Sequence, residues 1–171
     1  MGIDIGLAVI RIFIGYLLMA HGFQKVTYLF GGKGLQGGIE EFKGDGFRGG
    51  MPTALAAGAG QIGAGIFLML GLLTPVAGLV AASVMTVAAT VKIPHGMWVQ
   101  DDGVEYPLVL IVIVSALAIS GPGQFSIDAL LGITQLPYWV GIIAALLGIV
   151  TGLMTRALLH RPASAHEPTT T

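Results

Sequence analysis

The sequence contains no cysteine and few charged residues. Of its 171 residues only 10% are charged, whereas 54% are hydrophobic and the mean hydropathy is +0.86. A chain without cysteine cannot form a disulfide, hold an iron–sulfur cluster on its own thiolates or perform dithiol chemistry. Soluble domains carry about a quarter charged residues, so this composition predicts an integral membrane protein in contact with lipid.

Basic runs and recognisable catalytic motifs are also absent. The formal net charge is −1, and without a basic cluster the chain has no electrostatic footprint for nucleic acid. The sequence shows no Walker loop, dinucleotide fingerprint, Ser-His-Asp set or zinc signature, so no catalytic residue is assigned and no metal site is expected. The N-terminus lacks the basic region of a signal peptide, and we expect the first apolar segment to be retained as a helix.

Long apolar segments dominate the chain. A helix needs about 20 residues to span a bilayer, and only the fourth segment is clearly shorter. Proline in the short link at residues 73–75 cannot continue the preceding helix but suits the start of the next, which predicts a tight helical hairpin. We therefore predict an all-α, polytopic transmembrane bundle with five spans, at residues 5–28, 53–73, 76–93, 106–121 and 138–159.

Two features of these segments bear on packing. Residues 30–50 are rich in glycine and charge, and are either a solvated loop or contain a short amphipathic helix at 35–42 with Ile39 and Phe42 facing inward. Small residues spaced by four allow helix backbones to approach closely, within one subunit or in a homodimer. Such rows are Ala56, Gly60 and Ala64, then Ala59 and Gly63, and in the last segment Ala144, Gly148 and Gly152.

Lysine and arginine are concentrated at one set of helix ends. With five spans, the first loop, the third loop and the C-terminal tail share one side, and that side holds every basic residue except Arg11. The positive-inside rule then predicts a bacterial inner-membrane protein with its N-terminus outside and its C-terminus in the cytoplasm. The polar tail at residues 161–171 is expected to be disordered.

The first apolar segment carries ionisable residues inside it. Arg11, His21 and Lys25 fall on one helical face, and charge within a membrane span is expensive unless it faces the bundle interior. Arg11 lies toward the opposite side of the membrane from His21. A partly buried arginine needs a carboxylate partner, and Asp128 is predicted to lie on the same side as Arg11. We predict a structural ion pair between Arg11 and Asp128.

The remaining polar residues gather near the cytoplasmic ends of the spans. Together they could bind an anionic or quinone-like head group, with histidine able to transfer a proton near neutral pH. Each has a simpler interpretation: the lysines can extend to the interface, His21 and Gln61 can bridge helices, and His95 can be a loop residue. The candidate ligand-binding set is His21, Lys25, Gln61, Lys92, His95 and Tyr106.

A series of short motifs runs through residues 7–131. The motifs are Arg11-x-x-x-Gly15, His21-Gly22-x-x-Lys25, Gly71-x-Leu73-Thr74-Pro75, Lys92 with His95-Gly96, Glu105-Tyr106-Pro107 and Gly121-Pro-Gly-x-Phe-Ser-x-Asp128. In their order and spacing, more than in any single motif, they resemble the DoxX family. The resemblance implies a four-helix inner-membrane core at residues 1–132, with an additional transmembrane helix at 133–160.

The resemblance also implies an association with redox enzymes. Members of the family resemble membrane subunits of a thiosulfate:quinone oxidoreductase, partners of superoxide dismutase and a sulfurtransferase, or companions of enzymes that modify copper-binding peptides. One departure is Gln61, where the family commonly has glutamate. If that carboxylate carries protons in the family, this chain has lost it.

Three functions are consistent with these residues. The first is a redox-associated membrane subunit that binds a quinone and works with a separate soluble partner, an oxidoreductase or a stress enzyme. The second is a non-catalytic membrane scaffold or assembly factor, for which the small-residue rows and loops would suffice. The third is a small-solute transporter, which would require discontinuous helices or inverted repeats that the sequence does not clearly show.

Overall fold

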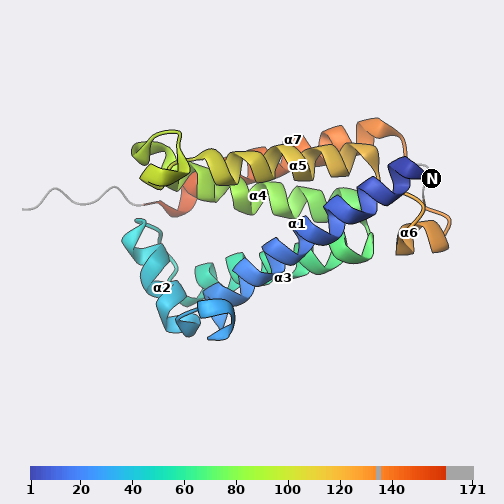
Figure 1. Cartoon of the computed structure of the whole chain (residues 1–171). Coiled ribbons are helices and arrows are strands. Elements are labelled where there is room, and N and C mark those ends of the chain that lie inside the picture. Colours follow the sequence, from blue (N-terminus) through green and yellow to red (C-terminus); the bar gives the residue numbers. More distant parts are fainter. Residues whose placement is uncertain (134–135, 161–171) are drawn as a thin grey trace, which may run out of the picture.

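The computed structural model describes residues 1–133 and 136–160, and in this part of the chain the regular structure is helical. The long helices run along one bundle (Figure 1). Shorter helices occupy the connections, namely η1 (Leu29–Gly31), α2 (Gly34–Gly44), η2 (Ile93–His95), η3 (Val99–Asp101) and α6 (Ile127–Leu130). The all-α bundle predicted from the sequence is confirmed, with long helices α1 (Gly2–Val26), α3 (Met51–Leu70), α4 (Thr74–Lys92), α5 (Glu105–Ser120) and α7 (Tyr138–Leu159).

Helix lengths match the thickness of a bilayer. Helices α1, α3, α7 and the continuous stretch Thr74–His95 are each long and apolar enough to cross a membrane. Helix α5 is apolar but shorter, at 16 residues, as the sequence predicted for the fourth segment. The chain is therefore an integral membrane protein.

The predicted hairpin joins α3 to α4. Helix α3 ends at Gly71, whose φ of 63° lies in the left-handed region that glycine adopts without strain, and Pro75 occupies the first turn of α4. Leu73 has a φ of 46°, which is costly for a residue with a side chain. The surrounding structure must therefore stabilise this turn, and its contacts are described below.

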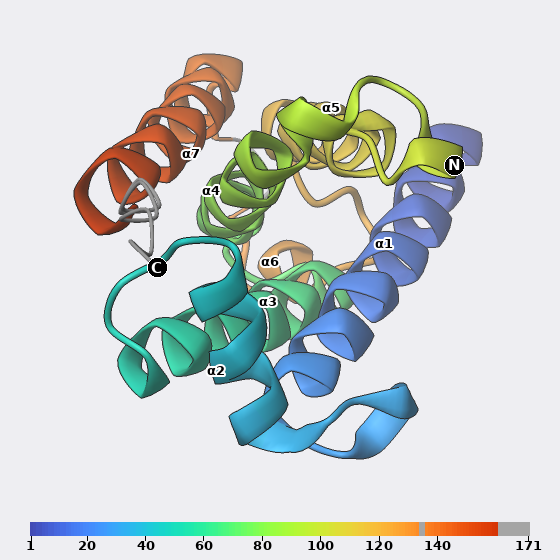
Figure 2. The same ribbon diagram turned by 90° about the vertical axis from the view of Figure 1, so that its left-hand side faces the viewer.

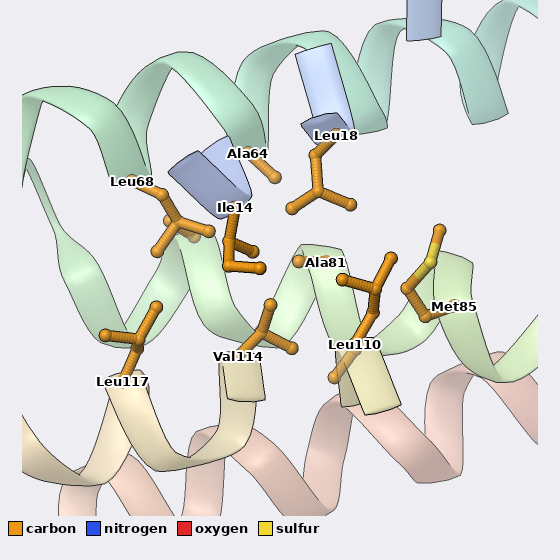
Figure 3. Close-up of a cluster of buried hydrophobic side chains, with 11 residues drawn as sticks. Ile14, Leu18, Ala64, Leu68, Ala81, Met85, Leu110, Val114 and Leu117 are labelled. Atoms are coloured by element: carbon orange, nitrogen blue, oxygen red, sulfur yellow. The ribbon is translucent and has the colours of Figure 1, made fainter. Parts of the chain in front are cut away.

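Close helix packing holds the centre of the bundle together. Glycines bring α1 against α3, because a methyl group at Gly65 would overlap the carbonyl oxygen of Gly15, and one at Gly58 would overlap the side chain of Val26. Apolar side chains from α1, α3, α4 and α5 fill the space between these helices (Figure 3). The buried cluster includes Ile14, Leu18, Leu68, Ala81, Met85, Leu110, Val114 and Leu117.

The fifth long helix, α7, packs mainly on α4 and also on α5. Its contact depends on the predicted row of small residues, since Gly148 and Gly152 lie against the α4 backbone at Leu79 and Ser83. These glycines are buried within one chain, so they are not free to form a dimer contact.

Connections divide between the two ends of the bundle. The N-terminus, the α3–α4 turn and α6 lie at one end, and α2, the α4–α5 loop and the C-terminal end of α7 lie at the other (Figure 1). Residues 35–42 lie within α2. Of the two interpretations of residues 30–50, the one with a short helix is therefore confirmed. Its buried Phe42 packs with Phe47 and Ala54, and α2 contacts α1 and α3. We call this end the strap end, after the strap formed by residues 42–48.

Candidate functional site

A cavity of about 350 Å³ lies at the strap end of the bundle. Figure 2 views the bundle from this end, with α4 between α3 and α7 and with α2 in front of α3. The walls are mostly aliphatic, and the polar side chains lie at the base and at the mouth. The lining residues that matter below are Lys25, Glu41, Phe42, Asp45, Phe47, Ala56, Ala57, Gln61, Ser83, Lys92, Thr155 and Leu159.

Gln61 is a buried polar group that lines this cavity. It lies ten residues after the first residue of α3, Met51, which at ~1.5 Å per residue places it about 15 Å along the helix. Its side chain is 2% exposed, and its Oε1 atom has no hydrogen-bond donor in the structure. A buried acceptor without a donor costs free energy of about 1–3 kcal/mol, which a ligand that donates a hydrogen bond would recover.

The two lysines of the cavity are paired with carboxylates. Lys25 Nζ lies 2.8 Å from Glu41 Oε1 and 5.1 Å from the centre of the Phe42 ring. Lys92 Nζ lies 2.5 Å from Asp102 Oδ2. Both ammonium charges are therefore balanced at the mouth, so the cavity does not present an uncompensated positive charge to an anion.

Asp45 adds a second carboxylate to the mouth. Partial burial raises the pKa of Asp45 above its ordinary value, the negative charge of Glu41 raises it further, and Lys92, Lys25 and Arg156 oppose the shift. A carboxyl with a raised pKa holds its proton closer to neutral pH than an exposed one. Asp45 is thus a titratable group beside a cavity whose buried amide, Gln61, does not titrate.

His21 and Tyr106 meet outside the cavity. The His21 Nε2 atom lies 2.9 Å from the Tyr106 hydroxyl, and His21 Nδ1 lies 2.8 Å from Gln24 Oε1. Gln24 in turn donates from Nε2 to the carbonyl oxygen of Phe30, 2.7 Å away. This chain of hydrogen bonds ties α5 and the turn after α1 to the same face of α1.

The predicted binding set is therefore divided. Lys25, Gln61 and Lys92 line the cavity, and His21 and Tyr106 pair with each other on the α5 side of α1. His95 lies in the loop after α4, with Nδ1 3.3 Å from the Asp102 carboxylate. The sequence analysis described residues 30–50 only as rich in glycine and charge, and α2 brings Glu41 and Asp45 of this segment to the cavity mouth.

The direct ion pair predicted between Arg11 and Asp128 does not form among the described residues. Both side chains are 1% exposed, but each bonds to a different helix end. The Arg11 guanidinium lies beside Gly71, and the backbone N–H of Asp128 donates to the Gly71 carbonyl oxygen, 3.0 Å away. Arg11 donates to the carbonyl oxygens of Leu68, 3.1 Å away, and of Met69 at the end of α3.

Asp128 instead binds the opposite end of this turn. Its two carboxylate oxygens accept from the backbone N–H groups of Leu73 and Thr74, at 2.9 and 3.2 Å, where α4 begins. A cation at a helix C-terminus and an anion at a helix N-terminus each complement the local dipole. The two charges thus satisfy backbone groups of the α3–α4 turn, which is why a direct pair is not needed.

Potential metal ligands are scattered. In residues 1–133 and 136–160, no three histidine, cysteine, aspartate or glutamate side chains are grouped closely enough to hold a metal ion.

Comparison with known proteins identifies one family. The model of the family described as DoxX matches residues 6–93, which include all of α3 and α4 and most of α1. The match ends before α5, so the predicted boundary at residue 132 goes beyond the matched region. No curated protein and no solved structure matches the chain.

Proposed function

This chain belongs to the DoxX family, and from that premise we propose that it is a redox-associated membrane subunit that binds a quinone head group in the strap-end cavity. In this proposal a separate soluble enzyme supplies the redox chemistry and exchanges electrons with the bound quinone. The observation that carries the proposal is the buried Gln61 amide, which lines a largely apolar cavity and whose Oε1 lacks a donor.

The chemistry of the cavity favours a neutral head group over an anion. Lys25 and Lys92 each have a carboxylate partner, so an anionic ligand would have to displace Glu41 or Asp102. An amide suits both states of a quinone, because its NH₂ group donates to a quinone carbonyl and its oxygen accepts from a hydroquinone hydroxyl. The aliphatic walls complement the ring and its substituents.

Protons must enter and leave from groups other than Gln61. Glutamine does not titrate, so Gln61 binds and orients the head group without carrying a proton. Glu41 and Asp45 at the mouth are the carboxylates positioned to exchange protons between this cavity and water. In this respect they take the place of the glutamate that the family commonly has at position 61.

The proposal is tested by measuring what the protein binds. We would purify the chain in mild detergent, extract it for mass spectrometry, and measure binding of a decyl-substituted benzoquinone. We expect quinone with wild type and about tenfold weaker binding with Gln61→Ala, since one buried hydrogen bond is lost. Gln36→Ala, on the exposed face of α2 away from the cavity, is the matched control and should bind like wild type.

A scaffold function makes the opposite prediction. If wild type neither retains a quinone nor binds the decyl-substituted probe, the quinone proposal is wrong. A co-purifying soluble protein without any bound small molecule would then favour a scaffold or assembly factor. Co-purification of a soluble oxidoreductase together with quinone would support both parts of the proposal.

We also propose that the strap end faces the cytoplasm of a bacterial cell and that the N-terminus lies outside. Basic residues support this orientation, because the strap end carries Lys25, Lys33, Lys43, Arg48, Lys92 and Arg156, and the other end carries only Arg11 within the described residues. A green fluorescent protein fused after α7 should fluoresce, and alkaline phosphatase fused at the same place should be inactive. The reverse pattern would overturn the orientation.

A further inference from the structure

The strap-end cavity lies beside a gap between two helices that do not close against each other. Helix α3 packs on α1 and α4, and α7 packs on α4 and α5 (Figure 2). Ala56 and Ala57 of α3 line one side of the cavity, and Thr155 and Leu159 of α7 line the other. The floor between them is the face of α4 with Ser83, Val84, Val87 and Ala88.

Small side chains keep this gap open toward the membrane. Ala56 is exposed although it lines the cavity, so the cavity wall at this point is continuous with the outer surface of α3. Across the gap, Thr151 is also exposed, and its hydroxyl donates to Ser83 Oγ, 3.1 Å away on α4. Both helices are membrane spans, so this side of the bundle faces lipid.

The strap covers the end of the cavity that faces water. The backbone N–H of Arg48 donates to the carbonyl oxygen of Leu159, 2.7 Å away, and Phe47 pairs with His160 in an antiparallel bridge. The Arg156 guanidinium lies 5.1 Å from the centre of the Phe47 ring and donates to the carbonyl oxygen of Asp45. The strap is thus fastened to the end of α7, above the cavity.

The side of the strap that faces the cavity is aromatic. Phe42 and Phe47 are 9% and 6% exposed, and their rings meet edge to face with centres 5.7 Å apart. Both side chains line the cavity, so a ligand entering from water would have to displace two buried aromatic rings. The side between α3 and α7 has no comparable cover among the described residues.

We infer that the ligand enters from the bilayer between α3 and α7, and that it is a quinone whose apolar tail lies along Ala56 and Thr155 while its head group reaches Gln61. This inference rests on the proposed function and adds the route of entry and the position of the tail. A tail in this gap stays in contact with lipid and with α3 and α7, whereas passage beneath the strap would expose it to water. The inference also gives α7, which lies outside the family match, a direct part in ligand binding.

The position of the tail is tested by filling the gap. Wild type, Ala56→Phe and Ala59→Phe would be placed in lipid nanodiscs. Each would be titrated with a decyl-substituted benzoquinone and with the tailless benzoquinone of the same head group. Ala59 is the matched control because it is an exposed alanine of α3 that does not line the cavity.

The expected result depends on the tail. Ala56→Phe should weaken binding of the tailed probe at least tenfold and leave the tailless probe within twofold of wild type. Ala59→Phe should leave both probes unchanged. If Ala56→Phe affects the two probes equally, or neither, the gap does not hold the tail and the inference is overturned while the head-group site stands. If wild type binds neither probe, the proposed function itself fails.

The route is tested by locking the strap. The chain has no cysteine, so Phe47→Cys/His160→Cys introduces one pair, at positions that face each other across the antiparallel bridge. The reduced and oxidised forms of this variant should bind the tailed probe at the same rate. A tenfold or greater loss of association rate on oxidation would show entry beneath the strap and overturn the lateral route. Phospholipid in place of quinone in the extract would overturn the ligand class.

Discussion

The Nε2 atom of His21 and the hydroxyl of Tyr106 lie 2.9 Å apart and join α1 to α5. These two helices share few other contacts, and the rings also meet edge to face with centres 5.6 Å apart. Neither side chain lines the strap-end cavity. The pair therefore connects helices, which is the simpler of the interpretations that the sequence allowed for His21.

This arrangement predicts that stability and quinone binding respond to different residues. Tyr106→Phe should lower the free energy of unfolding by about 1 kcal/mol, because one hydrogen bond is lost. Its affinity for the decyl-substituted benzoquinone should stay within twofold of wild type. Thermal unfolding in detergent and probe titration measure the two effects. A tenfold loss of affinity in a stably folded Tyr106→Phe protein would place the pair in the binding site after all.

Arg11 should be important for stability. Its guanidinium is 1% exposed and donates to the carbonyl oxygens of Leu68, Met69 and Phe125, which link α3 to the segment before α6. Arg11→Met should destabilise the fold by about 3 kcal/mol, because buried acceptors lose their donor. Arg11→Lys should recover only part of this, since one ammonium cannot reproduce the fork of donors. Chemical denaturation in detergent measures both values.

The matched control for Arg11 is an arginine of the strap end. Arg48 is exposed, so Arg48→Ala should change the free energy of unfolding by less than about 0.5 kcal/mol. If Arg11→Met proved no more destabilising than Arg48→Ala, the three carbonyl contacts would contribute little.

Asp128 should stabilise the strained turn before α4. Its carboxylate accepts from the N–H groups of Leu73 and Thr74, and Leu73 has a φ of 46°. Asp128→Asn keeps one acceptor oxygen and loses the charge, so it should lower the free energy of unfolding by about 1.5 kcal/mol.

A glycine at position 73 tests the link with strain. Leu73→Gly removes the cost of the positive φ, so it should offset part of the loss in an Asp128→Asn background. The double-mutant cycle is measured by thermal unfolding, with Asp101→Asn in the exposed α4–α5 loop as a control. If the effects of Leu73→Gly and Asp128→Asn on the free energy of unfolding simply added, Asp128 would not be coupled to the strain at Leu73.

The raised pKa of Asp45 predicts that the stability of the fold depends on pH. The pKa of Asp45 is raised in the folded state, chiefly by burial and then by Glu41, although Lys92, Lys25 and Arg156 oppose the shift. The folded state therefore binds its proton more tightly, and this contribution is lost as pH rises through the folded pKa. Asp45→Asn should match wild type in acid and melt roughly 1–2 °C higher at pH 7.

Asp102 provides a comparison of opposite sign. Its pKa is lowered, mainly by the hydrogen bond from Lys92, so its contribution is present above the unfolded pKa and is lost as pH falls. Asp102→Asn should lower the melting temperature at pH 7 and have no effect in acid. Melting curves from pH 3 to pH 8 would test both variants, and a shift of the same sign in each would contradict this assignment.

Several features of the fold follow from the sequence because each depends on a local property of the chain. The length of an apolar segment predicts a span, since every backbone group in lipid must bond within its own helix. The shortness of α5 and the Pro75 hairpin were predicted in this way, with helix ends displaced by a few residues. The alternation of ends also follows from the number of spans, which placed Arg11 and Asp128 together at one end.

The contents of the cavity depend on how the helices are arranged around one another. The sequence placed Gln61 and His21 near the same end of the bundle, but helix order and rotation decided that Gln61 lines the cavity and that His21 faces Tyr106. The glycines of α1 and α3 set this rotation by close backbone contact, a relation between two helices that neither segment shows alone.

The sequence by itself determined the class of the protein, its spans and the polar residues available at each end, because composition and apolar length are properties of single segments. Only the tertiary structure decided which of those residues meet. It placed α2 over the cavity. It also directed Arg11 to the end of α3 and Asp128 to the start of α4, on either side of Gly71, in place of a direct ion pair. The reason is that such contacts depend on packing between segments far apart in the chain, where close backbone approach fixes the position of each side chain.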